Sequence, residues 1–278
     1  MYNNIMRTIN ALKIQERMTK LISDCLVKPD EAVTRALENV NTDSEVERVA
    51  ASLIAENNRI ASRNRLYACQ DTGQAVLMVT LGDEVCCPGL FDALNCAVRE
   101  AYATARKSVA DPITRINTKD NTPAIIETEL VSGDTLTITF LAKGAGSENM
   151  SRLYMLTPAD GEDGIINAVM NAVELGGRNA CPPLVVGVGI GGVTETACTL
   201  SKRALLRKVG QYNDRADIAR LEKILLEKVN ATGIGVGALG GRLTALAVNI
   251  EAAPTHIGML PVAVNLSCHS LRHETAVF

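Results

Sequence analysis

Three of the chain's eight cysteines occupy segments rich in glycine, proline and small polar residues. Cys69 lies in Ala-Cys-Gln-Asp-Thr-Gly, Cys181 in Ala-Cys-Pro-Pro and Cys268 in Leu-Ser-Cys-His. Intervals of 112 and 87 residues exclude the short ligand spacing of a zinc finger, so only a folded chain can bring these thiols together. Three thiolates on an iron–sulfur cluster leave one iron without a protein ligand, and that iron can bind substrate as a Lewis acid. The pattern therefore predicts a catalytic cluster.

Two other interpretations of these cysteines stay open, namely buried thiols without a ligand and a zinc site. Cys25, Cys96 and Cys198 show the first behaviour in the sequence, because they fall in helix-like apolar stretches where a thiol acts as a small hydrophobic group. Structural zinc needs paired ligands and a fourth donor. The nearby candidates, His256 and His269, lack that paired spacing.

The composition sets limits on the core and on the partners. A chain of 278 residues can build a sizeable core, but an aromatic fraction of 3% without Trp makes that core depend on aliphatic side chains. A net charge of −3 argues against a nucleic-acid surface. The longest uncharged segment, 252–271, contains Pro, His and Asn and is a poor membrane span. Met1–Asn4 lead into a charged stretch rather than a signal peptide, so we expect a cytoplasmic, reducing location.

The pattern of apolar residues predicts an α+β fold in one domain, residues 1–278, with a helical N-terminal region followed by small mixed sheets covered by helices. The predicted helices start near Ile5, after Asp30, and at a capping box formed by Ser44 and Glu47, and a later helix covers Leu90–Val109. Predicted strands include 75–81 and 184–188. A hairpin of 124–130 with 135–142 is predicted around Ser132-Gly133-Asp134.

Two glycine patterns match the dinucleotide-binding spacing. They are Gly187-x-Gly189-x-x-Gly192 and Gly235-x-Gly237-x-x-Gly240. The fingerprint needs a second strand that ends in an acidic residue about 20 positions on, but the first pattern is followed by the basic, helix-like stretch Ser201-Lys202-Arg203-Ala204-Leu205, and the second pattern lacks a preceding strand. Tight turns and close backbone packing explain these glycines more simply than a nucleotide does.

Four motifs occur in one order along the chain. They are Cys69-Gln70-Asp71-Thr72-Gly73, Lys143-Gly144-Ala145-Gly146-Ser147-Glu148-Asn149, Cys181-Pro182-Pro183, and Pro254-Thr255-His256 through Cys268. Together they resemble the class I (iron–sulfur) fumarase and tartrate dehydratase family, specifically its α subunit or N-terminal half. The resemblance runs from about Ile5 to the end of the chain, and the second motif is closer to the fumarases. It implies that Cys69, Cys181 and Cys268 hold a [4Fe–4S] cluster.

Asp71 is the predicted general acid, because its carboxyl beside a ligand could protonate a departing hydroxyl if burial raised its pKa. An Asx turn before Gly73 is the structural alternative, and both can hold together. Gln70 could donate to a substrate carboxylate, and the resemblance places both residues in the active site.

The resemblance also assigns roles to three residues outside this motif. Arg106 would clamp a substrate carboxylate, although its position also suits a charge at a helix C-terminus, and Arg99 competes for the role. Gly146 would approach the substrate within an anion-binding loop, with a structural turn as the alternative. His256 would lie near the substrate as a catalytic residue, with a structural histidine as the alternative.

We therefore expect a hydro-lyase acting on a small dicarboxylate, with fumarate and L-malate first and L-tartrate as the alternative. The third hypothesis belongs to a different functional class and is a non-catalytic iron–sulfur sensor or scaffold. The chain offers no convincing base for the carbon-bound proton. The resemblance implies that the base belongs to a β subunit, in an α2β2 assembly.

Overall fold

The computed structural model describes residues 6–278, so the predicted helix start at Ile5 lies outside the described part. The chain divides into two compact units. Unit 1 comprises Met1–Pro29, Ala61–Lys143 and Arg272–Phe278, and unit 2 comprises Asp30–Ile60 and Gly144–Leu271. Helices and small mixed sheets in both units confirm the predicted α+β class. None of the helices within residues 6–278 has the length and apolarity needed to cross a bilayer.

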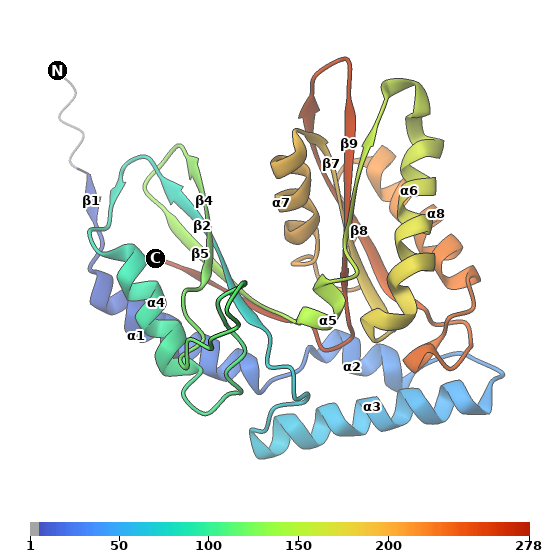
Figure 1. Cartoon of the computed structure of the whole chain (residues 1–278), viewed down its shortest axis with the longest axis horizontal. Coiled ribbons are helices and arrows are strands. Elements are labelled where there is room, and N and C mark those ends of the chain that lie inside the picture. Colours follow the sequence, from blue (N-terminus) through green and yellow to red (C-terminus); the bar gives the residue numbers. More distant parts are fainter. Residues whose placement is uncertain (1–5) are drawn as a thin grey trace. The chain divides into compact units, whose positions relative to one another are not determined.

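Unit 1 is built on a four-stranded sheet in the order β10-β5-β2-β4. Its strands are β2 (Gln74–Gly82), β4 (Ile125–Val131), β5 (Leu136–Lys143) and β10 (Arg272–Val277). Helices α1 (Ala11–Leu26) and α4 (Leu90–Ala101) cover one face of this sheet (Figure 1). Met18 and Leu94 from the helices join Leu77, Ile138 and Phe140 from the strands in one buried apolar core. A short pair, β1 (Arg7–Thr8) and β3 (Val85–Cys86), completes the unit.

The predicted hairpin between residues 124–130 and 135–142 is wrong, although both strands form. β2 lies between them, parallel to β4 and antiparallel to β5. The β4–β5 connection therefore crosses the end of β2. Gly82 allows this crossing, because a Cβ there would lie 2.2 Å from the carbonyl oxygen of Gly133.

The predicted helix over Leu90–Val109 is too long. α4 ends at Ala101, and the side chain of Tyr102 turns into the core. There its ring packs edge-on against the ring of Phe140, with the two ring centroids 6.4 Å apart. The Lys107 ammonium donates to the carbonyls of Tyr102 and Ala103 and so satisfies the last turn.

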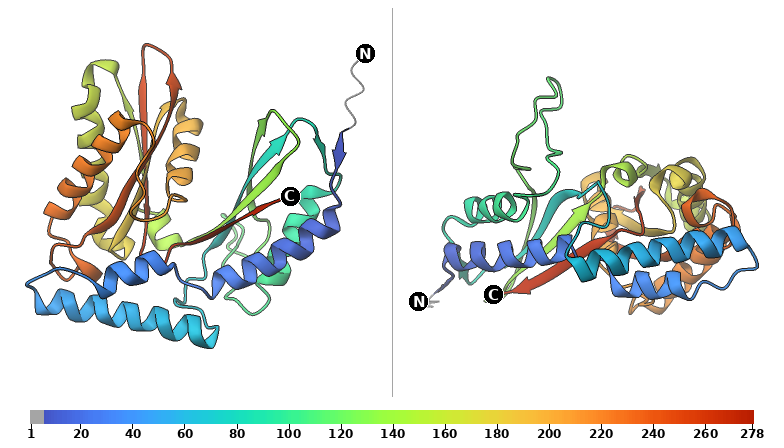
Figure 2. Two further views of the ribbon diagram at one scale, coloured as in Figure 1. Left: turned by 180° about the vertical axis from the view of Figure 1, so that it is seen from behind. Right: turned by 90° about the horizontal axis from the view of Figure 1, so that it is seen from below.

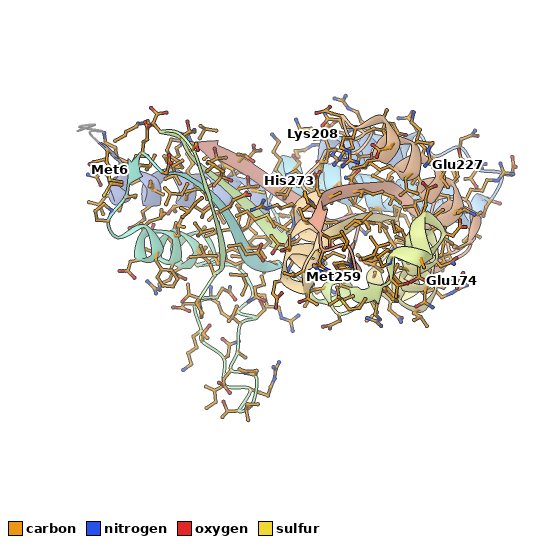
Figure 3. All side chains as sticks on the ribbon, turned by 90° about the horizontal axis from the view of Figure 1, so that it is seen from above. Met6, Glu174, Lys208, Glu227, Met259 and His273 are labelled. Carbon is orange, nitrogen blue, oxygen red and sulfur yellow. The ribbon has the colours of Figure 1, made fainter. Side chains whose placement is uncertain are left out.

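An arm of residues 107–122 follows α4 and stands away from the unit 1 sheet (Figures 2 and 3). A bridge between Ala110 and Asn117 closes it. At its tip the side chains of Ile113 and Ile116 are 87% and 69% exposed. Asp111 holds the tip turn, since its Oδ1 accepts hydrogen bonds from the backbone N–H groups of Ile113 (3.0 Å) and Thr114 (2.7 Å).

The predicted helices after Asp30 and Ser44 form as α2 (Glu31–Glu38) and α3 (Glu45–Asn64). Asp30 caps α2, accepting from the N–H of Ala32 at 2.7 Å. The predicted capping box is half correct. Ser44 Oγ accepts from the N–H of Glu47 at 3.2 Å, whereas the Glu47 carboxylate binds a distant loop.

Unit 2 is built on a second four-stranded sheet, in the order β6-β9-β7-β8. Its strands are β6 (Arg152–Leu156), β7 (Leu184–Gly192), β8 (Ala245–Thr255) and β9 (Leu260–Ser267). Helices α6 (Gly161–Gly176) and α8 (Ala216–Ala231) cover one face, and α7 (Thr194–Ala204) covers the other (Figure 2). A Cβ on Gly189 would lie 2.0 Å from the carbonyl oxygen of Ala197 in α7. Close packing therefore explains the glycines of the first pattern.

Candidate active site

The Cys69 motif forms an ordered loop of unit 1 between α3 and β2. The Asp71 N–H donates to Cys69 Sγ at 3.4 Å, a contact that stabilises negative charge on the sulfur. The Gly73 N–H donates to Asp71 Oδ1 at 3.0 Å, which is the predicted Asx turn. The buried Arg272 guanidinium donates to the carbonyls of Asp71 (3.3 Å) and Leu26 (3.2 Å) and so anchors the loop to the core.

Arg106 lies in the irregular segment after α4, and its side chain is exposed. The helix-terminus interpretation is wrong, because α4 ends at Ala101. Asn121 Nδ2 donates to the Arg106 carbonyl at 3.0 Å and fixes the backbone there. The competing Arg99 forms an ion pair with Asp120 at 3.0 Å. Arg106 is therefore the better candidate of the two for a substrate carboxylate.

Cys181 and Cys268 lie in loops at the same end of the unit 2 sheet. Cys181 adopts a left-handed conformation (φ 58°, ψ 67°) just after η2 (Gly177–Ala180) and precedes β7, and its side chain is exposed. Cys268 follows β9, whose last residue, Ser267, pairs with Val185 near the start of β7. The two loops meet, because His269 Nε2 lies 3.7 Å from Cys181 Sγ.

The sequence offered His269 only as an unpaired zinc candidate next to Cys268, and its contact with Cys181 comes from the fold. Burial lowers the pKa of its imidazole to about 4, so the ring is neutral at pH 7. Its Nδ1 is buried and has no hydrogen-bond partner within residues 6–278. A neutral imidazole beside Cys181 can donate a hydrogen bond to the sulfur or accept one from it, depending on its tautomer.

The Lys143–Asn149 motif forms a short helix, α5 (Ala145–Glu148), where an anion-binding loop was predicted. Glu148 attaches it to the rest of unit 2 through Lys202 Nζ (2.8 Å) and Asn265 Nδ2 (3.2 Å). Gly146 is exposed, and a Cβ there would have no described atom within 4 Å. The described chain therefore does not require glycine at this position, and the space beside it is open.

His256 lies at the other end of the unit 2 sheet, directly after β8. β8 runs parallel to β7, so the end of β8 is separated from the loops at the start of β7 by the length of a nine-residue strand, roughly 25–30 Å. The His256 ring is exposed, and its Nδ1 accepts from the Gly258 N–H at 3.1 Å. Unit 2 thus separates His256 from its own Cys181 and Cys268.

The donor set fits an iron–sulfur cluster in chemistry. Cys69 and Cys268 are partly exposed loop thiols and Cys181 is exposed, unlike the buried Cys25, and thiolates are the usual protein ligands of such clusters. Within the described residues, no three His, Cys, Asp or Glu side chains form a ready-made metal site. Cys69 belongs to unit 1, whereas Cys181 and Cys268 belong to unit 2. The convergence of the three sulfurs therefore stays a prediction.

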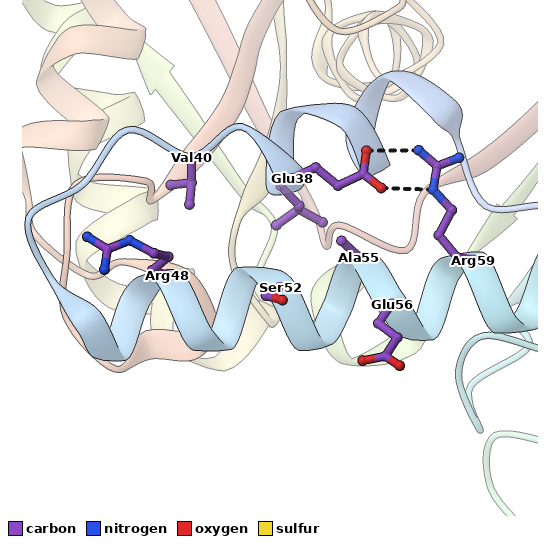
Figure 4. A pocket seen from close by; sticks show the side chains of 8 residues that line it. Glu38, Val40, Arg48, Ser52, Ala55, Glu56 and Arg59 are labelled. Atoms are coloured by element: carbon purple, nitrogen blue, oxygen red, sulfur yellow. Dashed lines mark hydrogen bonds and ion pairs between the residues drawn. The ribbon is translucent and has the colours of Figure 1, made fainter.

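A cavity of about 500 Å³ lies between α2 and α3, and none of the predicted site residues lines it (Figure 4). Leu37, Val40 and Ala55 provide its apolar wall. The ion pair between Arg59 and Glu38, at 2.8 Å, borders it. Since its lining contains no cysteine, this cavity is not part of the candidate site.

Ordered cysteine loops on an α+β scaffold suit an enzyme that binds a metal cluster, and comparison with known proteins identifies the family. Residues 15–277 match the family model described as fumarate hydratase (Fumerase). The chain belongs to this class I, iron–sulfur fumarate hydratase family, on its α-subunit side, and members of the family are hydro-lyases.

Two relatives illustrate the similarity. The putative L(+)-tartrate dehydratase subunit alpha of Methanocaldococcus jannaschii is 38% identical over 270 residues, which cover 92% of this chain and 94% of the relative. The L(+)-tartrate dehydratase subunit alpha of Escherichia coli (strain UTI89 / UPEC) is 31% identical over 283 residues, which cover 98% and 92%.

Proposed function

We propose that this chain is the α subunit of a [4Fe–4S]-dependent hydro-lyase that dehydrates L-tartrate. The observation that carries the proposal is the family match over residues 15–277, which includes all three loop cysteines. The names of the relatives reverse the order expected from the sequence, where fumarate came first and tartrate second.

Fumarate and L-malate are the second candidate substrate pair. The Lys-Gly-x-Gly-Ser-x-Asn motif at 143–149, which is closer to the fumarases, favours them, as does the description of the matching family. L-Tartrate and L-malate are both four-carbon dicarboxylates, and tartrate carries one additional hydroxyl group. The same carboxylate-binding residues therefore serve either substrate.

In the proposed mechanism, Cys69, Cys181 and Cys268 hold the cluster, which supplies Lewis-acid chemistry at a hydroxyl when bound. Arg106 binds a substrate carboxylate through its planar pair of N–H donors. Gln70 donates to a carboxylate as well, and the open space beside Gly146 lets the backbone of α5 approach the substrate.

Asp71 protonates the departing hydroxyl in this scheme. The Gly73 N–H donates to Asp71 Oδ1 and fixes the direction of the carboxyl, and the Asp71 N–H contacts Cys69 Sγ. The proposed proton donor is therefore hydrogen-bonded through its backbone to a proposed cluster ligand, which keeps the acid close to the reacting group.

The relatives are named as alpha subunits, and we propose that this chain, acting as one functional domain, pairs with a β subunit in an α2β2 assembly. The β subunit would supply the base for the carbon-bound proton. A catalytic role for His256 requires a cluster other than the one at Cys181 and Cys268 of its own chain, since the length of the sheet separates them.

Oxygen-free co-expression with the β subunit, followed by assays with L-tartrate, L-malate and fumarate, tests the proposal. We expect a cluster absorbance, turnover of tartrate at the highest kcat/KM, and no turnover by the isolated chain. A preference for fumarate selects the second candidate. A coloured complex without any dehydratase activity indicates the sensor reading and contradicts the enzymatic proposal.

A further inference from the structure

A buried carboxylate in the first turn of α3 is enclosed by the glycine-rich loop that precedes β8. Glu47 is fully buried. Its Oε2 accepts from the Arg242 N–H at 2.9 Å and its Oε1 from the Leu243 N–H at 2.8 Å. The Val236 N–H donates to it as well. One side chain therefore fixes both ends of the loop from Val236 to Leu243.

The loop is shaped to receive this carboxylate. A Cβ on Gly241 would lie 2.1 Å from Glu47 Cδ, so only glycine leaves the room that the carboxylate occupies. Burial acts to raise the pKa of Glu47, but hydrogen bonds from Thr42 and from the loop N–H groups outweigh it and lower the pKa. Glu47 is therefore charged at neutral pH, and its donors are matched to that charge.

The same loop supports the segment that carries Cys181. The Gly237 N–H donates to the carbonyl of Pro182, the residue after Cys181, at 2.9 Å. Ile234 packs against Gly177 at the start of η2, with its Cδ1 3.1 Å from the place of a Cβ on that glycine. The loop, through Gly237, and Ile234 just before it thus contact the Cys181 segment on both sides of the cysteine.

We propose that Glu47 is a positioning residue for the cluster, acting through the 236–243 loop to fix the backbone that carries Cys181. The inference rests on the proposed function, because it takes Cys181 as a cluster ligand. It also accounts for the second glycine pattern, because Gly237 and Gly240 lie in this loop and Gly235 directly precedes it. Glu47 does not touch the cluster itself in this scheme.

The test compares Glu47→Gln with a matched control, Glu45→Gln, which changes an exposed glutamate in the same helical turn. The amide would turn an N–H₂ group toward backbone donors and break the match. After identical anaerobic reconstitution of the αβ complex, we expect E47Q to retain less than half of the wild-type iron and sulfide per chain. E45Q should match the wild type.

A second readout separates positioning from general loss of structure. In the cluster-free full chain, alkylation of Cys181, followed by mass spectrometry, should be at least about threefold faster in E47Q. Cys198 on α7 is exposed and provides the internal reference, whose rate should not change. If E47Q does not fold, Thr42→Val removes one of the hydrogen bonds to the carboxylate, together with the one that the Thr42 hydroxyl accepts from the Ser44 N–H, and should change both readouts in the same direction by less.

Folded variants with wild-type iron content and an unchanged Cys181 alkylation rate would overturn the inference. A wild-type complex that never takes up a cluster would refute the proposed function instead. In that case the alkylation rate still decides whether Glu47 orders the Cys181 segment.

Discussion

The sheets of the two units share one arrangement of strand directions. In each, an inner strand (β2 or β7) has a parallel neighbour on one side (β4 or β8) and an antiparallel neighbour on the other (β5 or β9). An outer strand is antiparallel to β5 or β9, and it comes last along the chain in unit 1 (β10) but first in unit 2 (β6). In both sheets the connection from the parallel neighbour to the antiparallel one crosses the end of the inner strand.

The sheets differ in what covers them. Helices pack on both faces of the unit 2 sheet, whereas α1 and α4 form the core on one face of the unit 1 sheet. The strand sequences explain the difference. β7 reads Leu-Val-Val-Gly-Val-Gly-Ile-Gly-Gly, apolar or small throughout, while the first half of β5 alternates, with Thr137 and Thr139 half-exposed on the face opposite the core. The same strand arrangement thus occurs with helices on both faces and with a helix-covered core on one face, in keeping with the side-chain pattern of these strands.

Cluster binding and turnover should depend equally on the cysteines of the two units, and this prediction has the largest expected effect. Cys69→Ser in unit 1 and Cys268→Ser in unit 2 should each abolish both cluster absorbance and turnover, because the proposed function has each thiolate hold the same cluster. Cys198→Ser, on α7, is the control and should retain both. Full activity in either ligand variant would remove the proposed site.

A buried ion pair of unit 2 should contribute far more to the free energy of unfolding than an exposed ion pair of unit 1. Glu222 is fully buried, pairs with Arg207 and accepts from the Ile250 N–H at 2.7 Å. Glu222→Ala should lower the free energy of unfolding by about 2–4 kcal/mol, because Arg207 keeps only Glu251 as a carboxylate partner and the N–H groups of Ile250 and Asn213 lose their acceptor. Asp24→Asn, which breaks the exposed pair with Arg65, should change it by about 0–1 kcal/mol. Similar urea-denaturation midpoints for the two variants would contradict the contrast.

Enlarging a side chain should separate the covered face from the open one. Gly189→Ala places a methyl group 2.0 Å from a carbonyl oxygen of α7 and should cost about 2–3 kcal/mol of unfolding free energy. Thr137→Ile on the open face of unit 1 should change it by about 0.5 kcal/mol or less. Urea unfolding measures both, and a large loss in T137I would show that this face is packed.

Acid sensitivity gives the smallest effect and concerns unit 1. Hydrogen bonds from the Thr122 N–H and from Arg99 lower the pKa of Asp120 to about 2. Because the folded pKa lies below the ordinary value of 3.8, the stabilisation is present above about pH 4 and is lost as the pH falls toward 2. The stability difference between wild type and Asp120→Asn should therefore shrink over that range in unfolding measurements. A difference that does not change with pH would exclude this carboxyl as its source.

Signals that lie close together in the sequence predicted the structure well. The helix after Asp30 and the apolar strand at 75–81 formed as expected, since both depend on neighbouring residues. The hairpin around Gly133 failed because an earlier strand, β2, inserts between its arms, and a turn signal carries no information about that strand. The helix after Leu90 was predicted too long because the burial of Tyr102 depends on the sheet beneath it.

The candidate site shows the same division. Its cysteine loops were evident from composition, and the Asx turn at Asp71 followed from local chemistry. The approach of His269 to Cys181 spans 88 residues, and the contacts of Glu47 with Arg242 and Leu243 span 195 and 196. Such contacts depend on strand order, which no local pattern contains.

The arm at 107–122 has a practical consequence. Its tip lies outside both hydrophobic cores, so a single trypsin cut after Arg115 should leave two fragments that remain associated. For the same reason, the peptide bond between Ile113 and Thr114 is a suitable place to insert an affinity tag or a fluorophore without unfolding the subunit.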